Sequence, residues 1–313
     1  MNYKQNIIPL KDLNLTSRFL FDEVMEDPQI HQDVLSIIFQ KEIPLLDKAE
    51  TEKELRVSPL IRSIRMDVFS MDEENSIYNT EMQEKKKGDL AKRSRYYQAL
   101  IDTGLLKPGI PDYTQGHPAW PFGRFTRFNL LNTSYIIIIT PFDLFGYGKY
   151  QYTFEARCRE VPECTLEDKA VRIFLNTRGT NDEEVSKELV DFLHYLENTT
   201  DSAANASESA RIHRIHERVH KVKLSEEIGV KYMQAWEEKY YEREEGREEG
   251  RKEGRKEGRK EGRNDHLKEL IKKKLQKGKS PETIADEVEE ELDNVLTVIR
   301  KIAEEDESVN SGE

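Results

Sequence analysis

The run Ser134–Thr140, with the sequence SYIIIIT, limits the possible folds more than any other stretch of this 313-residue chain. β-Branched residues favour strands, and a strand without polar alternation is typically buried on both faces. Such a strand needs hydrogen-bonded neighbours at both edges and a layer of helices on each face. The sequence therefore predicts an α/β protein in which this run is the central strand of a mixed sheet.

Other segments supply the neighbours that a central strand requires. Turn residues and β-branched runs predict further strands at 50–58, 147–156 and 170–176, the second of which we expect to be antiparallel. Apolar residues at helical spacing predict two helices within 16–41 and one helix each at 90–103 and 182–196. These helices are long enough to cover both faces of the sheet.

A polar hairpin between residues 65 and 83 carries the candidate chemistry. Asp67 lies in its first predicted strand, and Glu81 and Gln83 lie in the second, where side chains two residues apart share a face. If the register places Asp67 beside Glu81, two carboxylates meet and require a cation; oxygen ligands favour Mg²⁺ or Mn²⁺. The alternative, which composition alone favours, is that both acids are solvated on an open face.

Several stretches of the sequence together resemble a known family. They are RMD at residues 65–67 with E-x-Q at 81–83, followed by LAKRSRYYQALID, SYIIIITPFDLFGYGKYQYTFEARC and the late EGREEGRKEGR. This pattern is similar to the Rpn (recombination-promoting nuclease / putative transposase) family of the PD-(D/E)xK nuclease superfamily. The resemblance covers roughly residues 15–265.

The resemblance implies a restriction-endonuclease-like mixed sheet flanked by helices and a Mg²⁺-dependent DNA endonuclease, with Mn²⁺ as an alternative ion. By this resemblance Asp67 and Glu81 are the metal ligands, and the backbone carbonyl of Met82 joins them. Gln83 takes the place of the usual lysine of the superfamily, which helps to position the attacking water. An amide cannot stabilise charge as an ammonium group does. The family name also implies a role in recombination or mobile DNA.

Basic residues that follow the hairpin are the predicted DNA contacts. The net charge of −12 argues against a protein that coats nucleic acid, but phosphate binding needs only a local basic patch. We assign this role to Lys85, Lys86, Lys87, Arg93 and Arg95. For the two arginines the alternative is a solvated helix surface.

Two other segments leave more than one interpretation. Pro108–Asn132 mixes Trp120 with other aromatic and basic residues, which could stack on bases, although a loop held by its own aromatic side chains is the favoured interpretation. Glu23 or Asp33, in the N-terminal helices, could add an acid to the metal site. We favour ordinary packing helices with exposed acids at both positions.

Three histidines between residues 210 and 245, in a predicted long helix, raise the question of a zinc site. His213 and His220 are seven residues apart, or about 10 Å along the helix, which is too far for one ion. A pair of these histidines could bind a metal ion together with a partner from elsewhere in the chain. Solvated histidines are the favoured interpretation.

The last third of the chain predicts helices outside the main core. Glycine recurs every four residues in the EGR-rich stretch 245–263, which indicates a marginal helix or a flexible spacer, with a self-associating glycine face as the alternative. We expect a nuclease-like domain at 1–200, a long helix and repeat spacer at 201–263, a helical tail at 264–304 and a disordered end at 305–313. The tail is acidic, which favours homo-oligomer formation through its helices over DNA binding.

Cysteine content and hydropathy favour a soluble, cytoplasmic protein without a membrane partner. Cys158 and Cys164 are too few for a disulfide framework, the first residues lack a signal-peptide pattern, and the longest apolar run is too short to span a bilayer. The leading functional hypothesis is hydrolysis of DNA phosphodiester bonds. Its rivals are a degenerate member that binds DNA or protein without cleavage, and an assembly protein in which the α/β domain is a scaffold.

Overall fold

The computed structural model describes residues 7–44, 46, 50–55, 64–86, 88–105, 113–117, 120–126 and 131–310. The chain divides into two compact units, Met1–Met233 and Gln234–Glu313. The first unit contains the sheet and the helices that cover it, and the second is helical. Within the described residues, no helix combines the length and the apolar character needed to cross a membrane.

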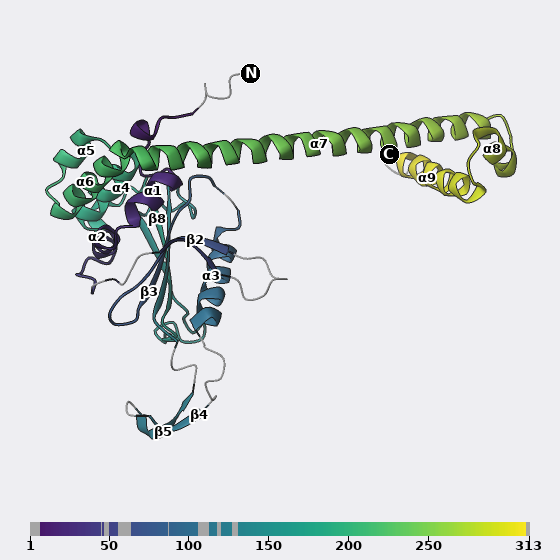
Figure 1. The fold of residues 1–313 in the computed structure, drawn as a ribbon. Helices are drawn as coiled ribbons and strands as arrows, with labels where there is room; N and C mark the ends of the chain where they lie inside the picture. Colours follow the sequence, from purple (N-terminus) through teal and green to yellow (C-terminus); the bar gives the residue numbers. More distant parts are fainter. Residues whose placement is uncertain are drawn as a thin grey trace. The chain divides into compact units, whose positions relative to one another are not determined.

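A mixed six-stranded sheet lies at the centre of the first unit (Figure 1). In spatial order its strands are β1 (Glu50–Leu55), β2 (Ile64–Met71), β3 (Ile77–Met82), β6 (Ser134–Thr140), β8 (Ala170–Asn176) and β7 (Gln151–Phe154). Strands β3, β6 and β8 are parallel, whereas β1, β2 and β3 form an antiparallel run and β7 is antiparallel to β8. The predicted α/β class and the interior position of 134–140 are confirmed.

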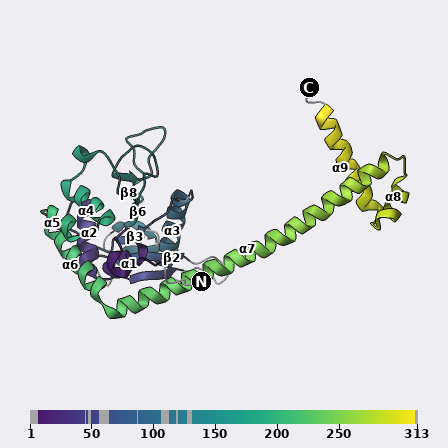
Figure 2. The same ribbon diagram turned by 90° about the horizontal axis from the view of Figure 1, so that it is seen from above.

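Helices cover both faces of this sheet, and strand β6 shows why. Ile136 and Ile138 pack on the face of α3 (Leu90–Leu105), whereas Ile137 and Ile139 belong to the core on the opposite face. Because successive side chains of a strand alternate between faces, an unbroken isoleucine run requires both layers. Figure 2 shows the same two layers from above, with α3 on one side of the strands.

The helical layer opposite α3 extends further along the chain than we expected. It contains α1 (Arg18–Met25), α2 (Pro28–Phe39), α4 (Lys187–Glu197), α5 (Asp201–Ala206) and α6 (Ala210–Leu224). The apolar stripe of α6 is buried in the same core as the sheet, through Ile212, Ile215, Val219 and Val222. The first compact unit therefore continues beyond residue 200 and includes the short helix α5.

Local sequence signals fix the starts of these helices. Asp27 caps α2 by accepting a hydrogen bond from the Gln29 backbone at 3.1 Å, and Pro28 occupies the first helical position. Ser186 caps α4 in the same way, after a 3-10 turn at Asp182–Glu184. The predicted helix at 182–196 therefore begins five residues later than expected. A second 3-10 turn, Leu10–Asp12, precedes α1.

The segment 108–132 is not a simple loop. It contains two antiparallel strands, β4 (Tyr113–His117) and β5 (Trp120–Thr126), which form a separate two-stranded sheet. The register shifts between Gln115 and His117. The side chains of these strands lie outside the described part of the structure, so the proposed contacts of Trp120 and its neighbours stay a prediction.

The second unit consists of most of α7 (Glu226–Leu275) together with α8 (Pro281–Val288) and α9 (Leu292–Asn310). A small core joins these helices through Ile271, Ile284, Ala285, Val295 and Ile302. The EGR-rich stretch is helical throughout, which is one of the two forms expected for it. The expected long helix at 210–245 is interrupted at Ser225, where an extended backbone ends α6 before α7 begins. At the end of the chain, α9 continues past residue 304, the expected end of the helical tail.

Candidate active site

The hairpin of β2 and β3 brings Asp67 and Glu81 together. Val68 pairs with Thr80 in the antiparallel register, and one step further along that register Asp67 lies opposite Glu81. Directly opposite residues share a face of the sheet, here the face covered by α3. Both residues are buried, with exposed fractions of 3% and 2%. The interpretation of these acids as solvated surface residues is therefore wrong.

Asp67 is held by groups from two other elements. Arg18, the first residue of α1, places its Nη2 atom 2.5 Å from Asp67 Oδ1. The Met82 backbone N–H donates to Asp67 Oδ2 at 3.2 Å. Because the N–H and C=O of one strand residue point to the same side of the strand, the Met82 carbonyl also faces β2. The Met82 side chain is buried in the opposite core, as its position in the strand predicts.

Arg93 of α3 forms an ion pair with Glu81 and partly compensates its negative charge. The Arg93 Nη2 atom donates to Glu81 Oε2 at 3.3 Å, and Asn79 Nδ2 donates to Glu81 Oε1 at 3.4 Å. Burial raises the pKa of Glu81 to about 7, and the neighbouring Asp67 carboxylate contributes, while Arg93 opposes the shift. Because the two carboxyl groups are buried side by side, ionisation of one makes ionisation of the other unfavourable.

Gln83 lies on the same face as Glu81 and contacts the same arginine. Its Oε1 atom accepts from Arg93 Nη2 at 2.7 Å, and its Nε2 atom donates to the Lys85 carbonyl at 2.9 Å. Both ends of the amide are thereby fixed, which orients Gln83 next to the carboxylate pair. Arg93 also lies over the Tyr97 ring, with its Cζ atom 5.5 Å from the ring centroid.

The predicted DNA-binding residues do not form one uniform group. Arg93 is part of the candidate site, whereas Lys85, Lys86 and Arg95 are exposed. Two positions along a helix turn the side chain by about 200°, so Arg95 lies on the other side of α3 from Arg93. Lys87 lies outside the described residues. The structure therefore separates a partly buried arginine at the acids from an exposed basic surface nearby.

The two acids considered as additional metal ligands have other partners. Arg214 of α6 contacts Asp33 at 2.8 and 2.6 Å with two nitrogens, which ties α2 to α6. Glu23 is buried and forms an ion pair with Lys231 near the start of α7. Neither acid is exposed. Each one compensates the positive charge of a basic group from a distant part of the chain.

Sequence reasoning missed the role of Arg18. This residue joins α1 to the candidate site, and Asp22, one turn later, contacts its Nε atom at 3.5 Å. Glu84 accepts a hydrogen bond from the Arg18 backbone at 2.8 Å, which satisfies a free N–H at the start of α1. The only local signal is the i, i+4 spacing of Arg18 and Asp22. The contact with Asp67 spans 49 residues, so periodicity could not reveal it.

A buried histidine supports the hairpin from the opposite face. His31 of α2 contacts the Thr80 hydroxyl with Nε2 at 3.0 Å and the Ser70 hydroxyl with Nδ1 at 3.1 Å. Burial lowers its pKa to about 3, so the ring is neutral at pH 7. This bridge fixes β2 and β3 relative to α2 next to the carboxylate pair.

The arrangement suits a divalent cation with oxygen ligands. Asp67 and Glu81 offer carboxylate oxygens from adjacent strands, and the Met82 carbonyl faces the same edge. Burial, with a contribution from the Asp67 carboxylate, raises the pKa of Glu81 even though Arg18 and Arg93 lie beside the pair. A cation between the carboxylates would favour the ionised form of both acids. Comparison of the chain with protein-family models, with curated proteins and with solved structures found no match.

Proposed function

We propose that the first compact unit is a PD-(D/E)xK-type nuclease domain that hydrolyses DNA phosphodiester bonds with Mg²⁺, for which Mn²⁺ can substitute. The observation that carries the proposal is the buried pair of Asp67 and Glu81 on adjacent strands, with an arginine and an oriented amide beside it. A mixed sheet with helices on both faces supports it. Asp67, Glu81 and the Met82 carbonyl would hold the ion.

Each residue of the site has a role in this proposal. A bound Mg²⁺ lowers the pKa of a water and offsets charge on the phosphate. Gln83 accepts or donates a hydrogen bond to orient the attacking water, and Arg93 stabilises negative charge on the phosphate oxygens. Lys85, Lys86, Lys87 and Arg95 contact the DNA backbone without reading its sequence. DNA is then the substrate, and the protein acts in the cytoplasm, in recombination or on mobile DNA.

Nicking of supercoiled plasmid tests this proposal. The wild-type protein should nick DNA with Mg²⁺ or Mn²⁺ and not in EDTA. Asp67→Asn and Glu81→Gln keep the side-chain size and remove metal-binding charge, so each should reduce the rate by about 1000-fold, equivalent to several kcal/mol of lost stabilisation. The matched control is Glu74→Gln, an exposed acid in the turn of the same hairpin, which should keep full activity. Equal nicking by Asp67→Asn would contradict the proposal.

A binding protein without catalysis is the second candidate, and the arginine contacts favour it. Arg18 and Arg93 already pair with the two carboxylates, and Gln83 is held by Arg93 and the Lys85 carbonyl. Such a site can be stable without an ion. Metal-independent DNA binding with no nicking by any variant would support this candidate over the nuclease. The assembly-protein alternative depends on the helical tail, and a measurement of molecular mass in solution tests it.

A further inference from the structure

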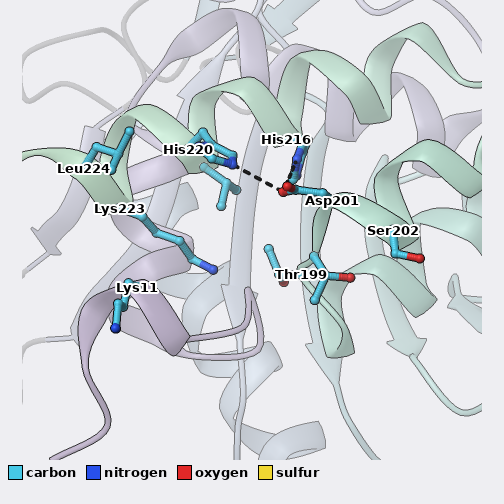
Figure 3. A pocket seen from close by; sticks show the side chains of 10 residues that line it. Lys11, Thr199, Asp201, Ser202, His216, His220, Lys223 and Leu224 are labelled. Carbon is cyan, nitrogen blue, oxygen red and sulfur yellow. Dashed lines mark hydrogen bonds and ion pairs between the residues drawn. The ribbon is translucent and has the colours of Figure 1, made fainter.

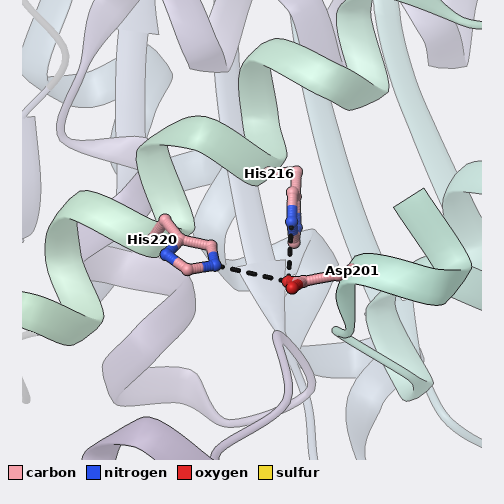
Figure 4. A group of neighbouring side chains, drawn as sticks. All are labelled: Asp201, His216 and His220. Atoms are coloured by element: carbon pink, nitrogen blue, oxygen red, sulfur yellow. Dashed lines mark hydrogen bonds and ion pairs between the residues drawn. The ribbon is translucent and has the colours of Figure 1, made fainter. Parts of the chain in front are cut away.

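A second cluster of metal-binding side chains lies in the helical layer of the first unit, on helices α5 and α6. His216 and His220 are one turn apart on α6, and Asp201 is the first residue of α5. Each histidine directs Nε2 at the same oxygen, Asp201 Oδ1, at 3.2 and 3.3 Å (Figure 4). Their three ligand atoms lie within 4.8 Å of one another. His216 is largely buried, whereas His220 is exposed, and the two share one carboxylate partner.

We propose that Asp201, His216 and His220 form a Zn²⁺ site that joins α5 to α6. In a tetrahedral zinc site the metal–ligand bonds are about 2.0–2.1 Å long, which separates neighbouring ligand atoms by about 3.4 Å. The two Nε2–Oδ1 distances of 3.2 and 3.3 Å fall close to that separation. Two imidazoles and one carboxylate form a donor set that binds Zn²⁺ in preference to Mg²⁺ or Ca²⁺.

The surroundings of His216 support a ligand role. Its other ring nitrogen, Nδ1, contacts the hydroxyl of the buried Tyr195 at 2.8 Å. When Nδ1 donates this hydrogen bond, Nε2 presents its lone pair to Asp201, as in zinc sites where a second group fixes the ring.

The cluster opens to a pocket, which leaves room for a fourth ligand. The pocket is lined by Thr199, Thr200, Ser202, Lys11 and Lys223 in addition to the three proposed ligands (Figure 3). The Asp201 and His220 side chains are 76% and 55% exposed, so solvent reaches the site. The two lysines weaken cation binding and favour an anionic fourth ligand over a neutral one. Three protein ligands and one open position are the arrangement of exchangeable zinc sites.

Zinc titration of the full-length protein, stripped with EDTA and carrying no polyhistidine tag, tests this site. Calorimetry should show one zinc per chain, and zinc should raise the unfolding temperature. Substitution of Co²⁺ should give the intense visible absorption of a low-coordinate ion. Asp201→Asn, His216→Ala and His220→Ala should each abolish these signals. Tyr195→Phe, which removes only the hydroxyl, should weaken binding by about 10–100-fold.

Two control variants make the outcome decisive. His213→Ala removes a histidine of the same helix that is not part of the cluster, and it should bind zinc as the wild type does. Asp67→Asn removes a proposed ligand of the nuclease site and should leave the zinc stoichiometry unchanged, so failure of one site is distinguishable from failure of the other. Binding that survives in His216→Ala and His220→Ala, or no zinc binding by the wild type, would overturn the inference and leave an Asp–His ion pair.

Discussion

Glu81 sets the charge of the candidate site, and its raised pKa has a measurable consequence for stability. Between its ordinary value of 4.5 and about 7, folded Glu81 holds a proton that the unfolded chain has lost. The contribution of Glu81 to the free energy of unfolding is therefore fully present below pH 4.5, and it is lost as the pH rises to 7. A shift of this size corresponds to as much as about 3 kcal/mol.

We therefore predict that Glu81→Gln stabilises the folded protein at pH 8 by up to about 3 kcal/mol, and that this difference shrinks towards zero near pH 4. Urea unfolding followed by circular dichroism in EDTA at several pH values measures it. Glu74→Gln, exposed in the turn of the same hairpin, should follow the wild type at every pH. A variant less stable than the wild type at pH 8 would mean that the Arg93 ion pair outweighs the cost of burial.

Arg93 and Arg95 differ only in which side of α3 they occupy, and this difference predicts different kinetics. Arg93 contacts Glu81 and Gln83, so Arg93→Gln should reduce the nicking rate by about 100-fold even at saturating DNA. Arg95 is exposed, so Arg95→Gln should weaken DNA binding in a salt-dependent manner and leave the saturated rate unchanged. Measurement of rate against DNA concentration separates the two effects. Equal effects of both variants would contradict the assigned positions.

At the scale of single elements, the glycine repeat of α7 allows a direct test of self-association. A Cβ atom added at Gly250, Gly254 or Gly258 meets no atom within 4 Å. Replacement of these three residues by alanine should stabilise the helix by up to about 1 kcal/mol each and slow amide exchange in the repeat. Sedimentation should show an unchanged molecular mass. A fall in mass would instead show that the glycines form a contact between chains, as the assembly-protein alternative requires.

Elements with a strong local signal could be predicted from the sequence. The isoleucine run predicted the bounds of β6, and the turn residues between two strand-like runs predicted the hairpin, because both signals depend on neighbours in the chain. The Arg18–Asp67 contact could not be predicted, since it depends on how α1 meets the sheet. The break at Ser225 and the helix α5 were missed because apolar periodicity continues across the first and is weak in the second.

At the scale of the whole molecule, the position of the domain boundary depends on α6. The expected boundary at residue 200 would remove a helix whose Ile212, Ile215, Val219 and Val222 are buried in the core of the first unit. Burial of each such side chain contributes about 1.5–3 kcal/mol, so the four together approach the entire stability of an ordinary domain. Residues 1–200 should therefore not fold alone.

A chain ended after Met233 should fold, because the first turns of α7 also belong to this unit. Lys231 pairs with Glu23, and the Tyr232 hydroxyl donates to the Ile8 carbonyl at 2.8 Å while its ring packs against Phe19. We predict a cooperative thermal transition and metal-dependent nicking for residues 1–233, and neither for residues 1–200. A folded, active chain of 200 residues would contradict this boundary. An inactive but folded chain of 233 residues would show that nicking requires the helical unit, because every residue of the candidate site is still present.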